Sequence, residues 1–196
     1  MRNLEKALQK EHIKLPKEKI GKLEEYIALL EKWNRVHNLS GAKSEEKIIE
    51  NIIDSIYPIK FIKEPKSFLD VGTGAGFPGL ILAIIWDKAE VVLAEPINKR
   101  ASFLRFISSS LELNDVEVFK DRVENLTHSP FSLISSRAVT DTKLLLDLTK
   151  KVSNEKTQFL FYKGSRVFSE VEALKQKYDI IQKNKRNYLW IKSNDS

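Results

Sequence analysis

The sequence predicts an α/β fold, in which a helical N-terminal extension precedes a mostly parallel sheet that ends in an antiparallel hairpin. Residues 1–62 carry apolar side chains at helical spacing. From residue 67 onward, short apolar runs that fit buried strands alternate with amphipathic runs that fit helices, which is typical of a parallel sheet. Residues 67–79 join the first strand to the first of these helices through four glycines, an arrangement typical of nucleotide-binding folds.

Three helices are expected in residues 1–62. The first ends before Pro16, and the second runs to about residue 38. Ser44 is a favourable N-cap for the third, which carries a stripe of isoleucines. Such stripes must be buried against one another or on the sheet that follows. The change of pattern near residues 62–66 predicts a helical extension over 1–62, packed on a Rossmann-like domain over 63–196.

The second part of the chain predicts five strands that alternate with helices, and then a hairpin. The strands are expected at 68–71, 91–94, 116–119, 131–135 and 157–162, and the helices at 80–86, 98–113, 144–152 and 167–178. Residues 179–182 and 188–191 form the expected hairpin. Ligands of such a sheet bind beyond the C-terminal ends of its strands, so the residues that follow each strand are candidates for a site.

Composition limits the classes of function. The chain has no cysteine, which excludes disulfides, thiolate metal sites and cysteine nucleophiles, and its three histidines are far apart, so no metal site is expected. It has neither a signal-peptide core nor an apolar run of about 20 residues, and it is therefore expected to be cytoplasmic, without a membrane partner. A net charge of +6 favours an acidic partner, nucleic acid before membrane, unless it reflects a lysine-rich coding bias. A monomer is expected.

The glycine turn matches two ligand classes. Gly74, Gly76 and Gly79 satisfy the G-x-G-x-x-G pattern of dinucleotide sites, in which a pyrophosphate lies at a helix N-terminus. That pattern is weak by itself, and a glycine-rich turn without a ligand is a third possibility. The residues around the glycines distinguish between the two ligands.

Three features favour S-adenosylmethionine. Asp70 lies two residues before the first glycine, and the tightest glycine set is G-x-G-x-G at Gly72, Gly74 and Gly76. Pro78 removes a backbone N–H at the start of the helix, where a pyrophosphate would need donors. A sulfonium cofactor is positively charged and has no phosphate, so a carboxylate beneath the turn is expected to attract it.

Other strand ends supply further candidates. Glu95 follows the second strand at the distance where an acidic residue accepts hydrogen bonds from ribose hydroxyls, although it can also be an ordinary solvated carboxylate. Asp121 or Glu124, after the third strand, is expected near the adenine, with backbone groups of Val123 available. Arg137 follows the fourth strand and is expected to face the cleft.

Missing motifs restrict the methyl acceptor. Methylation of an exocyclic base amine generally uses an Asn/Asp-Pro-Pro-aromatic loop after the fourth strand, and this chain has no Pro-Pro pair. Methylation of pyrimidine carbon 5 needs a thiolate, which is also missing. Guanine N(7) carries an in-plane lone pair and needs no base, so positioning and charge suffice. The sequence is compatible with that acceptor and does not single it out.

Motifs in order along nearly the whole chain resemble the RsmG family of 16S ribosomal RNA guanine-N(7) methyltransferases, also called glucose-inhibited division protein B. They are Y-I-A-L-L-E-K-W-N-R-V-H-N-L-S (26–40), I-I-D-S (52–55), F-L-D-V-G-T-G-A-G-F-P-G (68–79), N-K-R-A-S-F-L (98–104), R-V-E (122–124), S-R-A (136–138) and Y-K-G (162–164). The resemblance implies a class I S-adenosylmethionine-dependent methyltransferase fold and methylation of a guanine in the 530 loop of small-subunit ribosomal RNA.

The resemblance also implies site residues. The positions that correspond to the family's S-adenosylmethionine-binding residues are Gly72, Phe77, Val123, Glu124 and Arg137. Gly74, Gly76 and Glu95 join them on the argument from spacing given above. The chain departs from the family at Asn51, where many members have histidine, and at Glu95, where some have aspartate.

Basic residues in or beside these motifs predict a phosphate-binding rim around the cofactor site. The RNA-binding candidates are Lys32, Arg35, Lys99, Arg100, Arg122 and Lys163. Arg137 and Lys163 are the catalytic candidates, expected to orient the base or the RNA backbone for in-line methyl transfer. The alternatives are a metabolite or protein methyltransferase, a nicotinamide-dependent dehydrogenase, and a ribosomal RNA-binding assembly module with a relict cofactor site.

Overall fold

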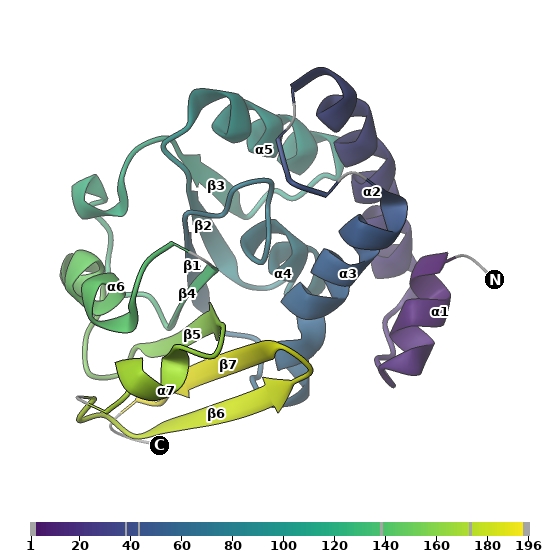
Figure 1. Ribbon diagram of the computed structural model, residues 1–196. Coiled ribbons are helices and arrows are strands. Elements are labelled where there is room, and N and C mark those ends of the chain that lie inside the picture. The colour runs from purple at the N-terminus through teal and green to yellow at the C-terminus, as the bar shows by residue number, and fades with distance from the viewer. Residues whose placement is uncertain (1–2, 38, 43, 138, 173, 194–196) are drawn as a thin grey trace.

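One seven-stranded sheet with helices on both faces forms the centre of the computed structural model, which describes residues 3–37, 39–42, 44–137, 139–172 and 174–193 (Figure 1). The strand order is β3-β2-β1-β4-β5-β7-β6. The strands are β1 (Ser67–Val71), β2 (Glu90–Ala94), β3 (Val116–Phe119), β4 (Leu133–Arg137), β5 (Gln158–Lys163), β6 (Tyr178–Lys183) and β7 (Arg186–Ile191). Strands β1 to β5 pair in parallel, and β7 lies antiparallel between β5 and β6. The predicted fold class is confirmed.

The three N-terminal helices are found where the sequence predicts them. They are α1 (Asn3–Lys10), α2 (Lys17–His37) and α3 (Glu45–Ile56), and a short 3-10 turn, η1 (Tyr57–Lys60), follows α3. Ser44 caps α3, since its side-chain oxygen accepts a hydrogen bond from the backbone N–H of Lys47 at 3.4 Å. Within the described residues, no helix has both the length and the apolar character needed to cross a membrane.

The helices after β1 are α4 (Gly79–Ile85), α5 (Asn98–Ser110), α6 (Thr142–Leu148) and α7 (Val167–Glu170), with 3-10 turns η2 (Val123–Asn125) and η3 (Lys150–Val152). Of these helices, α4 has the expected length, and α5, α6 and α7 are shorter than the sequence predicts. The predicted helix over 167–178 is wrong, because α7 ends at Glu170 and Tyr178 starts β6, paired with Ile191. The predicted strand at 131–135 begins two residues later, since the backbone N–H of Phe131 bonds to Val152 outside the sheet.

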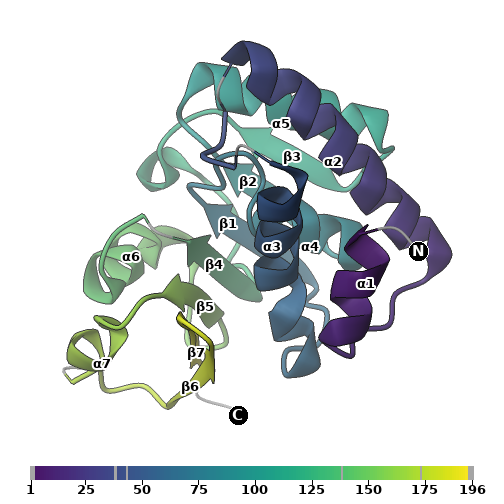
Figure 2. The same cartoon turned by 45° about the vertical axis from the view of Figure 1, so that its right-hand side comes forward.

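Alternate residues of the strands supply two apolar cores, one on each face of the sheet. Phe68 contributes to the core that contains α4, α5 and the buried faces of α1 to α3, whereas Leu69 contributes to the core beneath α6 and α7. Figure 2 shows α2 running beside α5, and α3 beside α4, so the N-terminal helices form an outer layer over that face. The helical extension therefore shares the core of the sheet domain.

The sheet brings the C-terminal ends of its parallel strands to one edge. The chain leaves β1 toward β2 on one side and later returns to β4 on the other, so β1 and β4 are neighbours in the sheet. Connections on the two sides diverge at this point and leave space at the ends of both strands. The glycine turn after β1 lies at that position.

Candidate active site

A cleft of about 590 Å³ lies at this edge of the sheet. Its walls come from the glycine turn after β1, the residues after β2, the end of β4, and the segment between α2 and α3. Among the described residues, the lining comprises Leu39, Ser40, Gly41, Ala42, Lys47, Asn51, Gly72, Thr73, Gly74, Ala75, Phe77, Glu95, Pro96, Ile97, Arg100, Arg137 and Val139. The N-terminal extension thus forms one wall of the site that the sequence places on the sheet.

The glycine turn has the left-handed backbone that its sequence predicts. Gly72, Gly74 and Gly76 have φ angles of 68°, 62° and 105°, which side chains rarely tolerate. At Gly74 the space where a Cβ would lie is open to the cleft, whereas a Cβ on Gly72 would come within 2.5 Å of Val139. Gly76 does not line the cleft, because its Cβ position faces Leu80 inside the turn.

Asp70 has a structural role and does not face the cleft, contrary to the prediction that its carboxylate attracts a sulfonium. The side chain is completely buried. One carboxyl oxygen accepts a hydrogen bond from the backbone N–H of Gly79 at 2.9 Å, and the other accepts one from the Ser135 hydroxyl. Burial raises the pKa of Asp70 to about 6. Asp70 therefore joins the end of β1 to the start of α4 and to β4.

Glu95 lies at the cleft end of β2, as the spacing predicts. It is buried, and its two carboxylate oxygens accept hydrogen bonds from the backbone N–H groups of Gly74 and Ile97, each at 2.9 Å. Each oxygen has a second lone pair, so Glu95 retains the capacity to accept bonds from a ligand. The carboxylate is held by the glycine turn on one side and by the loop after β2 on the other.

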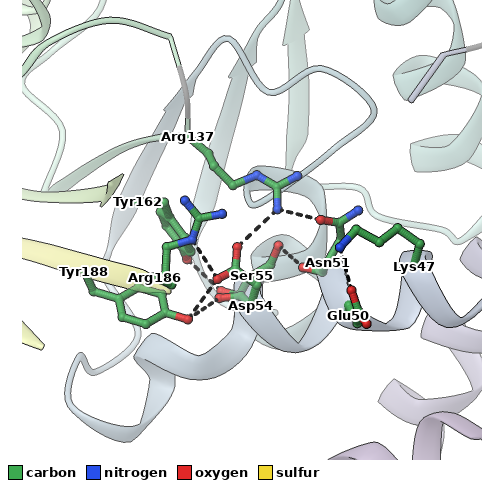
Figure 3. A network of polar contacts seen from close by, with 9 residues as sticks. All are labelled: Lys47, Glu50, Asn51, Asp54, Ser55, Arg137, Tyr162, Arg186 and Tyr188. Atoms are coloured by element: carbon green, nitrogen blue, oxygen red, sulfur yellow. Dashed lines mark hydrogen bonds and ion pairs between the residues drawn. The ribbon is translucent and has the colours of Figure 1, made fainter. Parts of the chain in front are cut away.

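Arg137 extends from the end of β4 to helix α3 and lines the cleft (Figure 3). Its Nη1 atom donates to Asn51 Oδ1 at 3.2 Å and to Asp54 Oδ2 at 3.3 Å. The guanidinium carbon lies 5.0 Å from the centre of the Phe77 ring, within the range of a cation–π contact. Two hydrogen bonds and an aromatic face thus fix the orientation of this arginine.

Asp54 connects Arg137 to the C-terminal hairpin. Its other oxygen, Oδ1, lies 2.9 Å from Arg186 Nε and 3.0 Å from the hydroxyl of Tyr188, both in β7 (Figure 3). In addition, the Tyr162 hydroxyl of β5 donates to the backbone carbonyl of Ser55 at 2.7 Å. Sequence reasoning did not identify these partners, although Asp54 and Ser55 belong to one of the quoted motifs. Arg186 has no comparable signal.

Two other predicted cofactor residues lie outside the cleft lining. Val123 is buried in η2, and Glu124 is half-buried beside it; neither lines the cleft.

Lys163, predicted as a catalytic and RNA-binding residue, is buried. Its Nζ atom lies 2.8 Å from both the Thr140 carbonyl and a Glu170 carboxylate oxygen. The prediction that Lys163 contacts RNA has no support from this position, because its charge is paired inside the protein.

The predicted basic rim is only partly assembled at the cleft. Arg100 lines it, together with Lys47, which sequence reasoning did not select. Lys99 is exposed and donates to the backbone carbonyl of His37 at 2.9 Å. Lys99 lies outside the lining of the cleft, as do the exposed predicted residues Lys32, Arg35 and Arg122.

Trp33, in one of the quoted motifs, does not line the cleft. It is half-buried and packs against Phe103 and Phe106, with ring centroids 5.4 and 5.5 Å apart. Among the residues that the structure describes, no three His, Asp or Glu side chains are grouped so that they could hold a metal ion. Asn38 and Ala138 of the quoted motifs lie outside the described residues.

Solved structures share the fold. A methyltransferase from Geobacter sulfurreducens matches 85% of this chain and 87% of its own, with a TM-score of 0.63 and 14% sequence identity. An O-methyltransferase from Bacillus cereus, solved in complex with SAH, matches 87% of this chain and 90% of its own, with a TM-score of 0.61 and 18% identity. At these identities the likeness shows the fold alone.

Sequence relatives are much closer. A protein of Aliarcobacter butzleri named ribosomal RNA small subunit methyltransferase G is 45% identical over 190 residues, which are 96% of this chain and 98% of that protein. The protein of the same name from Wolinella succinogenes is 43% identical, over 97% of this chain and 98% of its own. The family model GidB, described as rRNA small subunit methyltransferase G, matches residues 19–196. The chain belongs to the GidB family of rRNA small subunit methyltransferases.

Proposed function

We propose that this chain transfers a methyl group from S-adenosylmethionine to N(7) of a guanine in the 530 loop of small-subunit (16S) ribosomal RNA. The observation that carries the proposal is the composition of the cleft. An open glycine turn, a buried carboxylate at the end of β2 and a fixed guanidinium at the end of β4 meet in one hollow, in a chain whose relatives are named for this class of reaction.

The cleft fits the cofactor in shape and charge. Gly74 leaves open space where a side chain would block a ligand, and the Glu95 carboxylate, held by two backbone N–H groups, suits a pair of ribose hydroxyls. When bound, the cofactor supplies a methyl group that its sulfonium charge makes electrophilic. The roles of Gly72, Phe77, Val123 and Glu124 in holding it are part of the proposal.

Positioning is the main task left to the protein, because guanine N(7) attacks through its own lone pair and releases no proton there. Arg137 suits that task, since its orientation is fixed by Asn51, Asp54 and the Phe77 ring. A guanidinium has five N–H donors, so those that are not used by α3 can hold the base or an adjacent phosphate. Arg100 and Lys47 add positive charge at the same opening.

Lys163 is a positioning residue in this proposal, acting through the loop after β4. Its ammonium lies 2.8 Å from the Thr140 carbonyl, and its partner Glu170 accepts bonds from the backbone N–H and the hydroxyl of Thr142. This pair anchors the loop that places Val139 over Gly72. Substitution of Lys163 is expected to disturb both cofactor binding and methyl transfer.

Methyl transfer with base mapping tests the proposal. Small-subunit ribosomal RNA from cells that lack this protein is incubated with labelled S-adenosylmethionine, and the modified base is then located. We expect the label on a single guanine N(7) with the wild type, and turnover lowered at least about 100-fold by Arg137→Ala. Arg166→Ala, at an exposed arginine outside the cleft, is the matched control and should retain wild-type turnover.

Two results would overturn parts of the proposal. Normal turnover by Arg137→Ala rules out its orienting role. Binding of S-adenosylmethionine without any label on the RNA moves the acceptor to a metabolite, a protein or a later ribosomal particle.

We also propose that the protein acts as a cytoplasmic monomer. Sedimentation with and without ribosomal RNA checks this, and a stable dimer of the free protein would contradict it.

A further inference from the structure

A second hollow, of about 500 Å³, lies beside the cleft, between α1, α3 and the turn that joins β6 to β7. In Figures 1 and 2, α3 lies between α1 and the β6–β7 hairpin. We call this hollow the hairpin groove. Its charged lining residues are Lys10, Glu11, Lys47, Glu50, Asp54, Lys183, Lys185 and Arg186.

The negative charges of the hairpin groove are already paired. Glu11 binds Lys183 at 3.0 Å, and Glu50 binds Lys47 at 2.6 Å. Asp54 accepts from Arg186, as described above. The lining contains five cationic and three anionic side chains, so it carries an excess of two positive charges.

That excess resides on Lys10 and Lys185. Both side chains are exposed, and among the described residues neither has an ion-pair partner. Lys185 lies in the tight turn of the hairpin, where Asn184 has a left-handed φ of 53°, and Lys10 is in the last turn of α1 across the groove. Two unpaired ammonium groups from distant parts of the sequence therefore line one hollow.

The hairpin groove adjoins the active-site cleft. Lys47 and Asn51 line both hollows. Asp54 binds Arg137 of the cleft through one oxygen and Arg186 of the groove through the other (Figure 3). A polymer with one unit in the cleft would have its neighbouring units at the entrance to the groove.

We propose that the hairpin groove binds the sugar–phosphate backbone of the ribosomal RNA that flanks the target guanine. The assignment rests on the proposed function. Paired carboxylates with free ammonium groups between them suit a chain of phosphates, each of which needs a cation but no particular base. The groove therefore contributes affinity and register, while base recognition stays in the cleft.

RNA binding at several salt concentrations tests this proposal. The double variant Lys10→Ala/Lys185→Ala removes both free charges without breaking an ion pair that the structure shows. The probe is unmodified 16S ribosomal RNA transcript. We expect the affinity for RNA to fall about tenfold at moderate salt. The slope of log affinity against log salt, which is negative, should become less steep by about 1.4, which is about 0.7 for each lost phosphate contact.

A matched control is Lys66→Ala/Lys156→Ala. Both of these lysines are exposed and lie just before β1 and β5, at the opposite edge of the sheet. The control should bind RNA like the wild type. Both double variants should bind S-adenosylmethionine normally, and the groove variant should raise KM for RNA while kcat at saturating RNA stays unchanged.

The outcomes separate the groove from the proposed function. If the groove variant has the affinity and salt slope of the wild type, the proposal that the hairpin groove binds RNA is wrong, even if methyl transfer is confirmed. If the transcript binds in a groove-dependent way but is never methylated, the groove stands and the acceptor assignment fails. Lys185→Glu serves as a second variant. Reversal of this charge should weaken RNA binding more than its removal in Lys185→Ala does, and equal RNA affinities of these two variants would contradict the proposal.

Discussion

Asp70 is a buried carboxyl group whose pKa is raised to about 6 by the loss of solvent, although hydrogen bonds from Ser135 and Gly79 oppose the rise. The folded protein therefore binds this proton more tightly than the unfolded chain does. Between about pH 4 and pH 6 the folded state holds more protons, so the contribution of Asp70 to stability falls as pH rises through this window.

Replacement of Asp70 by Asn removes this titration. The amide oxygen can still accept a hydrogen bond from the Gly79 N–H, and the amide NH2 group can donate one to the Ser135 hydroxyl. The free energy of unfolding of Asp70→Asn, relative to wild type, should rise by about 2 kcal/mol between pH 4 and pH 7, because only the wild type must then bury a charge. Urea unfolding of both proteins across this range measures the difference. A difference that does not change with pH would contradict the assignment.

Asp54 holds two guanidinium groups, and its charge should matter more than its shape. Asp54→Asn leaves Arg137 and Arg186 without their shared anion, and we expect it to lower the free energy of unfolding by about 2 kcal/mol. We also expect methyl transfer to fall, since Arg137 loses a fixed orientation. Denaturation and single-turnover assays measure the two effects. Asn51→Ala is the comparison, because it removes a neutral partner of Arg137 and should cost less stability.

The site residues that follow strands were predictable, and their partners were not. Gly74, Glu95 and Arg137 come directly after predicted strands, where the geometry of a parallel sheet places ligand-binding residues. Asn51 and Asp54 meet Arg137 across 86 and 83 positions of sequence, and no local pattern encodes such a contact. The mistaken role of Asp70 has a similar cause, because proximity to the glycines in sequence does not give the direction of a side chain.

At the scale of an element, the start of α4 depends on a glycine for a reason other than backbone freedom. A Cβ on Gly79 would lie 2.5 Å from the Cβ of Asp70 and 2.6 Å from a methyl group of Leu93. Helix α4 can therefore approach β1 and β2 closely only because this position has no side chain. The same approach lets the Gly79 N–H reach the buried carboxyl of Asp70.

A pair of glycine substitutions distinguishes close packing from an ordinary helix position. Gly79→Ala should lower the free energy of unfolding by about 1–3 kcal/mol or more, because the neighbours are buried and must move. Gly21→Ala, in α2 with no atom within 4 Å of the new Cβ, should raise it by about 0.5–1 kcal/mol. Thermal and chemical denaturation measure both changes. Equal effects of the two substitutions would rule out the packing argument.

The end of α7 shows why helical spacing was misleading. Apolar residues at 168, 171, 174 and 178 match a helix, but only Val171 and Leu174 reach the core, whereas Phe168 and Tyr178 are exposed by 48% and 38%. Tyr178 gains a strand partner in Ile191 instead. Pairing within the β6–β7 hairpin therefore outweighed the helical periodicity at this end. In α2 and α3 the apolar stripes are buried, and the helices form as the periodicity predicts.

At the scale of the whole molecule, we propose that the helical extension and the sheet fold as one unit. Buried residues of α1, α2 and α3 belong to the same apolar cluster as those of α4 and the sheet. Tyr26 of α2 donates to the Ala75 carbonyl at 2.7 Å, so the glycine turn itself is held from the extension. The predicted division at residue 62 therefore separates two parts of a continuous core.

A fragment of residues 63–196 tests that dependence. Without α1 to α3, the outer faces of α4 and α5 and the tyrosines of β5 and β7 would meet water. We expect the fragment to lose the near-ultraviolet circular dichroism and cooperative thermal unfolding of the full chain. A fragment with a sharp transition would show that residues 63–196 are an independent domain.

The parallel order of β1 to β5 follows from alternation of strands and helices, but the position of β7 does not. Either strand of a hairpin can pair with an edge. The structure places β7 against β5, where Tyr188, Leu189 and Ile191 are buried, and leaves β6, whose residues are exposed or half-buried, at the margin. The more apolar strand takes the inner position, which the pattern of each strand alone does not determine.

The contact between Asp54 and Arg186 spans 132 positions of sequence, and this distance is also an interval of time. At about 5–20 residues per second, a ribosome needs roughly 7 to 26 s to advance from one residue to the other. During that interval α3 and the helices that pack on it, α1, α2 and α4, have been made, whereas β7, which supplies Arg186 and Tyr188 to Asp54, has not. The pairing of the Asp54 carboxylate is therefore completed only when nearly the whole chain has been synthesised.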